Sequence, residues 1–216
     1  MATDNARGAE LLAQLARQPL RTVGSAAAAA VSRHPRQQLA RLVDRGVLRR
    51  AAQGYYVVVP QEYVGTAWLP GLEAVAAGIG SVMFGADDAI LMGVSAARLH
   101  GVIPRSLGVA VVAAPRQRAA LQLVDRDALV RFVARDTARL DAELIRTELG
   151  EALVTTPEQT VLDLARRPDL GDASVDVPAA IQALYQRCDR ERLAELAAEQ
   201  RMRATLERVT AMAGER

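Results

Sequence analysis

The chain has 216 residues, half of them apolar, which is enough for one large or two small domains with packed cores. All 27 basic residues are arginines, so chemistry that needs a lysine is excluded: a Walker A loop, a Schiff base or an E-x-K nuclease pair. No apolar run approaches the roughly 20 residues of a membrane span, the first ten residues lack the apolar core of a signal peptide, and a lone cysteine, Cys188, allows no internal disulfide. These features predict a cytoplasmic protein with no contact to a membrane.

The net charge of +2 conceals a division along the chain. Residues 1–60 carry nine arginines and three acids, a net +6, whereas residues 61–216 carry 18 arginines and 22 acids, a net −4. A basic footprint confined to one part of a chain is typical of a protein in which that part alone meets nucleic-acid phosphates.

The first elements in chain order are predicted as a helix over residues 6–18, a short strand over 20–23 and an alanine-rich helix over 25–31. The next helix, residues 33–45, has clear boundaries. Ser32 is expected to cap it, Pro35 is tolerated only in its first turn, and Gly46 ends it. Leu39, Leu42 and Val43 form its buried stripe. Its polar face carries arginine and glutamine, the side chains that pair with guanine and adenine edges in the major groove.

A β-hairpin is predicted to follow, with strands over residues 47–50 and 55–59 and a turn over 51–54. Helix, turn, helix and hairpin in this order indicate a winged helix-turn-helix, with two arginines beside the hairpin tip. The alternative is an ordinary solvated surface, but residues 32–50 hold six arginines against one acid, and solvated helices usually mix both signs. The candidate DNA-binding residues are Ser32, Arg33, His34, Arg36, Gln37, Gln38, Arg41, Arg49, Arg50 and Gln53.

Residues 61–67 are expected to connect this domain, residues 1–60, to a second domain, residues 61–216. We expect that second domain to fold alone. Its predicted elements are a helix over 68–83, a short helix over 96–100 capped by Ser95, strands over 107–114, 128–134 and 142–149 with a short continuation at 152–154, and helices over 157–164, 177–187 and 190–212. The expected fold class is mixed α/β: a winged helix-turn-helix followed by an α+β domain with a small sheet flanked by helices.

Catalytic signals in the second domain are weak. Ser95 and His100 could form a nucleophile–base pair, but about 500° of helical turn separates them in angle, and a histidine bonded to a backbone carbonyl is the better interpretation. No carboxylates have metal-ligand spacing, and no glycine-rich phosphate loop is present. The sequence therefore predicts no enzyme, no metal and no cofactor.

Three segments carry a family resemblance: W-L-P-x-L-E over residues 68–73, S-A-A-R-L-H-G-V-I-P-R over 95–105 and V-T-T-P-E-Q-T-V-L-D-L-A over 154–165. Together with the winged helix, they resemble the AbiEi-type antitoxins of bacterial type IV toxin–antitoxin systems, in the compact actinobacterial form. The resemblance implies that the first domain binds inverted repeats in its own promoter and represses it. It implies that the second neutralises a nucleotidyltransferase toxin of the AbiEii kind, in this family generally without a stable complex. Within the second segment, Ser95, Arg98 and His100 are the candidate residues for antitoxin function.

Two other functions stay open from the sequence. One is a ligand-responsive winged-helix transcriptional regulator, which would need an apolar pocket with convergent polar groups. The other is an enzyme with a fused DNA-binding domain. Because one winged helix makes few base contacts, selective binding is expected to need two copies, and a homodimer on double-stranded DNA is the simplest arrangement.

Overall fold

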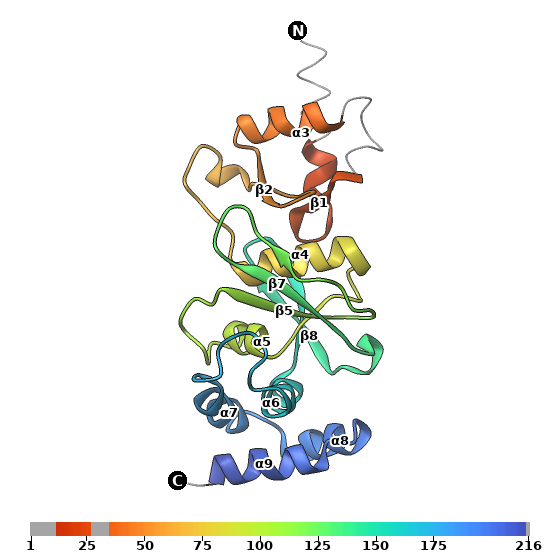
Figure 1. Cartoon of the computed structure of the whole chain (residues 1–216), viewed down its shortest axis with the longest axis vertical. Coiled ribbons are helices and arrows are strands. Elements are labelled where there is room, and N and C mark those ends of the chain that lie inside the picture. Colours follow the sequence, from red (N-terminus) through yellow and green to blue (C-terminus); the bar gives the residue numbers. More distant parts are fainter. Residues whose placement is uncertain (1–11, 27–34, 215–216) are drawn as a thin grey trace.

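The computed structural model describes residues 12–26 and 35–214 as a stack of tiers, with α3 near one end and α9 at the other (Figure 1). Residues 12–16 are helical. The named elements are η1 (Pro19–Arg21), β1 (Thr22–Gly24), α3 (Pro35–Asp44), β2 (Leu48–Ala52), β3 (Tyr55–Val58), η2 (Gln61–Tyr63), α4 (Leu72–Phe84), β4 (Ile90–Leu91), α5 (Val94–Leu99), β5 (Val109–Ala114), β6 (Leu121–Gln122), β7 (Leu129–Ala134), η3 (Thr137–Arg139), β8 (Ala142–Thr147), β9 (Gly150–Thr155), α6 (Pro157–Arg166), α7 (Val177–Tyr185), α8 (Arg190–Glu199) and α9 (Arg203–Gly214).

The amino-terminal unit contains a three-stranded antiparallel sheet in the order β1-β3-β2. One face of this sheet packs against α3 and the helical residues 12–16. The buried residues of this core are Leu15, Val23, Leu39, Leu42, Leu48 and Val58. The predicted strand at 20–23 is confirmed as β1, which begins two residues later and ends one residue later. The predicted alanine-rich helix lies mostly outside the described residues.

The second unit is built on one six-stranded sheet in the order β6-β7-β5-β4-β9-β8. β5 runs parallel to β7 and β4 parallel to β9, whereas the other neighbours are antiparallel. The predicted strands at 107–114, 128–134 and 142–149 are confirmed as β5, β7 and β8. The expected short continuation at 152–154 is instead a full strand, β9, that turns back along β8. The sheet is larger than predicted because the two-residue strands β4 and β6 are too short to show in the sequence pattern.

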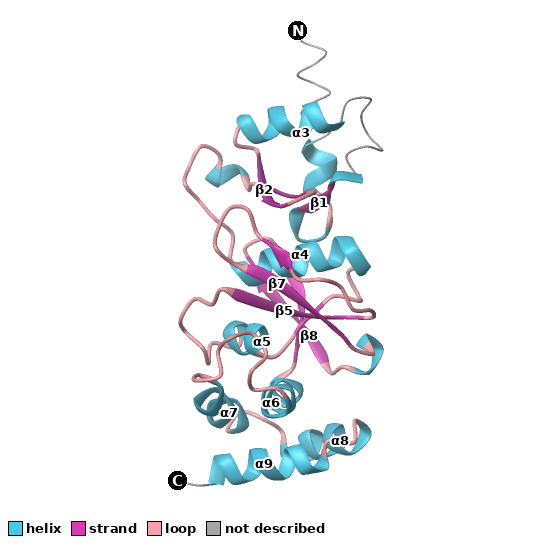
Figure 2. Cartoon of the chain, in the orientation of Figure 1, coloured by secondary structure: helices cyan, strands magenta, loops and turns pink. Residues whose placement is uncertain are grey.

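Helices cover both faces of this sheet (Figure 2). α4 lies between the two sheets and contacts β1 on one side and β5 on the other. The helix predicted over 68–83 therefore exists, but it begins at Leu72 because Pro70 and Gly71 precede it. Gly78 permits the close approach of β1: a Cβ atom there would lie 2.0 Å from Thr22 Oγ1.

The opposite face of the sheet is covered by α5 and α6, with α7, α8 and α9 beyond them (Figures 1 and 2). The predicted cap of α6 is confirmed, since Thr156 Oγ1 accepts a hydrogen bond from the Gln159 amide. The single last helix predicted over 190–212 is wrong, because the chain breaks into α8 and α9 at Arg201, whose φ is +57°. The Met202 amide bonds to Ala197 O and the Arg201 amide to Ala198 O, which is a Schellman end with arginine at the position usually held by glycine.

One buried hydrophobic cluster spans both sequence-predicted domains in the structure. Leu20, Ala51, Ala52 and Val57 of the first unit belong to the same buried cluster as α4 and the β5–β7 face of the large sheet. The proposed boundary near residues 60–70 therefore separates segments of the chain that pack together.

Candidate nucleic-acid interface

The helix α3 lies at the outer end of the amino-terminal unit (Figure 1). Leu39 and Leu42 are buried beneath it, as their spacing predicts. At its carboxyl end the Gly46 amide bonds to Val43 O and the Val47 amide to Leu42 O, with Gly46 at φ +69°. This Schellman end satisfies the last carbonyl groups and fixes the helix on the sheet.

The outward face of α3 carries Arg36, Gln37 and Arg41, all exposed. Within the described part of the chain, none of the three makes a side-chain hydrogen bond or ion pair. Gln38 is half-buried and so lies at the margin of this face rather than at its centre. The other three candidates that the sequence assigned to this helix, Ser32, Arg33 and His34, lie outside the described residues.

The arginines of the hairpin do not lie beside its tip, which corrects the sequence prediction. β2 continues through Ala52, so the turn is only Gln53–Gly54, with Gln53 exposed. Arg49 pairs in register with Val57 and Arg50 with Tyr56, in the middle of the hairpin. Ala51 and Ala52 read as turn residues in the sequence because they are small, but both are fully buried.

These two alanines join the hairpin to the second unit. The Val124 amide donates to Ala51 O at 2.9 Å, and Ala52 forms an isolated antiparallel bridge with Leu123. The outer edge of β2 is thus paired at this point, which fixes the hairpin to the segment before β7. Arg49 remains half-buried and Arg50 exposed.

The candidate antitoxin residues occupy internal structural positions. The buried Ser95 lies inside α5, whose N-cap is Gly93, so the predicted Ser95 cap is wrong. Its hydroxyl accepts a hydrogen bond from the Val111 amide at 2.9 Å. The Arg98 guanidinium bonds to Glu73 at 2.7 Å.

His100 Nε2 lies 2.8 Å from Thr155 O, which agrees with the predicted backbone-bonded histidine. The structure therefore gives Ser95 and His100 separate partners rather than a shared proton. Cys188 is also a structural group: its thiol donates to Leu184 O, and burial together with the nearby charge of Glu158 raises its pKa to about 12.

A buried polar cluster that sequence reasoning missed surrounds Asp163, within the segment that carries the family resemblance. The carboxylate accepts hydrogen bonds from Arg135 at 2.9 Å and Gln159 at 3.3 Å. Gln159 also bonds to Gln200 at the end of α8. Burial raises the pKa of Asp163, although Arg135 opposes this effect. The cluster ties α6 to the carboxyl ends of β7 and α8.

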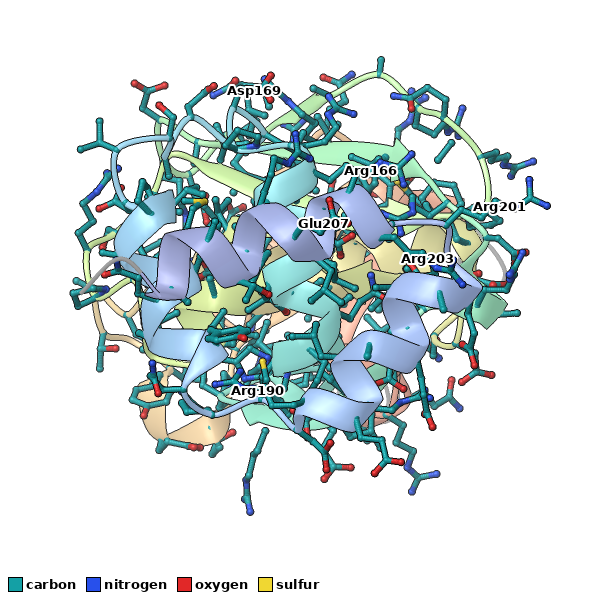
Figure 3. The ribbon with its side chains drawn as sticks, turned by 90° about the horizontal axis from the view of Figure 1, so that it is seen from below. Arg166, Asp169, Arg190, Arg201, Arg203 and Glu207 are labelled. Carbon is teal, nitrogen blue, oxygen red and sulfur yellow. The ribbon has the colours of Figure 1, made fainter. Side chains whose placement is uncertain are left out.

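The far end of the molecule carries both signs of charge (Figure 3). Arg166, Arg201 and Arg203 are exposed there alongside Asp169 and Glu207. Such mixing is typical of a solvated surface, whereas a protein surface that binds nucleic acid is usually basic over its whole extent. The charges thus favour the α3 end as the nucleic-acid interface.

Over the described residues, no group of His, Cys, Asp and Glu could hold a metal ion, and no helix is long and apolar enough to cross a membrane.

The fold and this surface define a mixed α/β protein in which a small unit with a basic outer helix packs through α4 on a six-stranded sheet. The same fold is found in the crystal structure of the RV2827C protein from Mycobacterium tuberculosis, with a TM-score of 0.57 and 18% sequence identity over 98% of this chain and 82% of that chain. No curated protein sequence matches the chain. The family model for the AbiEi antitoxin C-terminal domain matches residues 88–214, more than half of the chain. The chain belongs to the AbiEi antitoxin family, which gives it the role of an antitoxin in a toxin–antitoxin system.

Proposed function

We propose that this antitoxin binds DNA through a winged helix-turn-helix in its first 60 residues, with α3 as the recognition helix. The order of helix, β1, α3, β2 and β3 among the described residues supports this proposal. So does the net charge of +6 on residues 1–60. The DNA would be an inverted repeat in the promoter of its own operon, which the bound protein represses. The partner would be a nucleotidyltransferase toxin of the AbiEii kind.

The observation that carries the proposal is the outward face of α3. Arg36, Gln37 and Arg41 are exposed and have no partner within the described residues. Arginine and glutamine make paired hydrogen bonds to guanine and adenine edges, and α3 lies at the end of the described part of the chain, where a major groove can approach it without a clash from the other described elements. We assign base contacts to these residues, and contacts to the DNA backbone or the minor groove to Arg49, Arg50 and Gln53.

The test measures binding of the full chain to its promoter fragment by fluorescence anisotropy, at several salt concentrations. Arg36→Ala or Arg41→Ala should cost about 1–3 kcal/mol and relax the preference for one base pair. Arg49→Ala or Arg50→Ala should weaken all sequences alike and lower the salt slope by about one. Arg203→Ala, which removes the same charge from the far end, is the matched control. The assignment is reversed if the β2 variants change base preference and the α3 variants do not.

A footprint on the same promoter tests the stoichiometry. One unit of this size offers few base contacts, so two copies on paired half-sites, about one DNA turn or a multiple of it apart, are expected. Full affinity for a single half-site would contradict this.

A further inference from the structure

A groove lies where the amino-terminal unit, the connector and the segment before β7 meet. Its cavity volume is about 420 Å³, within the range of small-molecule sites. We call it the junction groove and define it by Arg49, Arg50, Tyr63, Trp68, Val124 and Asp125. In Figure 1, the connector with η2 and the loop before β7 lie on the same side of the molecule, below α3.

One wall of the junction groove is a stacked aromatic pair. The rings of Tyr63 and Trp68 have centroids 4.8 Å apart and are inclined by only 2°. A turn holds them in place, because Thr66 Oγ1 donates to Tyr63 O and accepts from the Trp68 amide. Tyr63 is 37% exposed and Val124 55%, so the wall presents apolar and ring surface to solvent. A flat aromatic surface of this kind stacks on planar heterocycles.

The charge of the junction groove is positive. Arg49 and Arg50 have no ion pair within the described part of the chain. The acid in the groove, Asp125, is already neutralised, because Arg126 contacts both of its carboxylate oxygens at 3.0 and 3.2 Å. Two guanidinium groups without an ion pair, beside a neutralised acid, favour an anion, and phosphate is one that arginine binds through paired hydrogen bonds.

We propose that the junction groove binds a purine nucleotide, with the base stacked on the exposed Tyr63 ring, which Trp68 supports from behind, and the phosphates on Arg49 and Arg50. One part of this proposal rests on the proposed function. Because the same two arginines are assigned to DNA phosphates, nucleotide and operator would compete for them, and the nucleotide would lower operator affinity.

The chain has a single tryptophan, so its fluorescence reports on the junction groove alone. Full-length protein is titrated with ATP, GTP and tripolyphosphate in the absence of DNA. ATP or GTP should quench Trp68 to saturation, since the base stacks on the exposed Tyr63 ring, which itself lies against Trp68, whereas tripolyphosphate should not. The proposal is overturned if neither nucleotide quenches saturably up to millimolar concentration, or if tripolyphosphate displaces ATP as effectively as GTP does, because then only phosphate is recognised.

Variants test which residues contact the nucleotide. Where Trp68 is changed, nucleotide binding is measured by calorimetry instead of fluorescence. Arg49→Gln together with Arg50→Gln should raise the Kd for ATP about tenfold or more, and Trp68→Ala about fivefold or more. Trp68→Phe keeps a ring and should bind nearly as well, and Arg203→Gln should bind as the parent does. Circular dichroism checks that each variant is folded. Equal weakening by Arg203→Gln and by the β2 pair would overturn the site.

Competition between ATP and operator DNA distinguishes this inference from the proposed function. ATP should weaken operator binding of the parent, and the effect should disappear in the β2 double variant. The fluorescence arm contains no DNA, so quenching with failed operator binding contradicts only the proposed function. Normal operator binding without quenching contradicts only the nucleotide site.

Discussion

Asp163 shows how a single buried carboxyl can join three elements. It was visible in the sequence only as part of a family segment, because its partner Arg135 directly follows β7 and its partner Gln159 lies one helical turn before it. Sequence spacing predicts the cap that Thr156 forms but cannot show that Arg135, 28 residues away, completes the cluster. The same limit applied to Arg98, whose partner Glu73 lies on another helix.

The raised pKa of Asp163 predicts a pH dependence of stability. Burial lets the folded chain hold this proton to a higher pH than the unfolded chain does, so stability falls as pH rises from about 4 through the raised pKa. Asp163→Asn removes this titration. As pH rises through that window, the parent should lose unfolding free energy that the variant keeps. The unfolding free energy of the variant relative to that of the parent should therefore increase with pH, as measured by urea denaturation. A difference that is constant with pH would contradict the assignment.

At the scale of elements, patterns with a local cause were predictable. α3 and α6 have capping or ending residues and a buried stripe, and both appear where expected. The break between α8 and α9 was not predictable, because arginine rather than glycine occupies the left-handed position. The pairing of the hairpin with the segment before β7 was not predictable either. Small residues such as Ala51 and Ala52 are equally typical of a turn and of a close contact between two segments.

The contact between α4 and β1 predicts the effect of Gly78→Ala. Alanine favours a helix over glycine by about 1 kcal/mol, but the new Cβ would overlap Thr22 Oγ1. Forcing atoms into a packed contact costs about 1–3 kcal/mol, so the variant should be less stable in thermal denaturation. Gly214→Ala is the matched control, because no atom lies within 4 Å of a Cβ there. A Gly78→Ala variant as stable as its control would mean that the two elements pack less closely than described.

At the scale of the whole molecule, the shared core changes the expectation that residues 61–216 fold alone. Removing Leu20, Ala51, Ala52 and Val57 would expose one side of α4 and part of the large sheet. We therefore predict that the full chain unfolds in one cooperative transition by calorimetry, and that the fragment 61–216 unfolds at a lower temperature or aggregates. Two separate transitions, with the fragment reproducing one of them, would show that the units are independent.

The segment that matches the family and the proposed DNA-binding face lie at different places in the molecule. The family match covers residues 88–214, and the basic face of α3 stands at the opposite end from α9. Because deletion of the first unit would damage the shared core, point substitutions on α3 are the cleaner way to separate the two activities.

The most direct measurement is therefore co-expression of the toxin with the full chain carrying both Arg36→Ala and Arg41→Ala, with operator binding measured on the same protein. The exposed positions of these side chains predict an intact fold. We predict that this variant loses operator binding and still protects the cells, whereas an Arg203→Ala control keeps both activities. A folded double variant that no longer protects would show that neutralisation requires DNA binding, and would contradict the assignment of two separate functions to one chain.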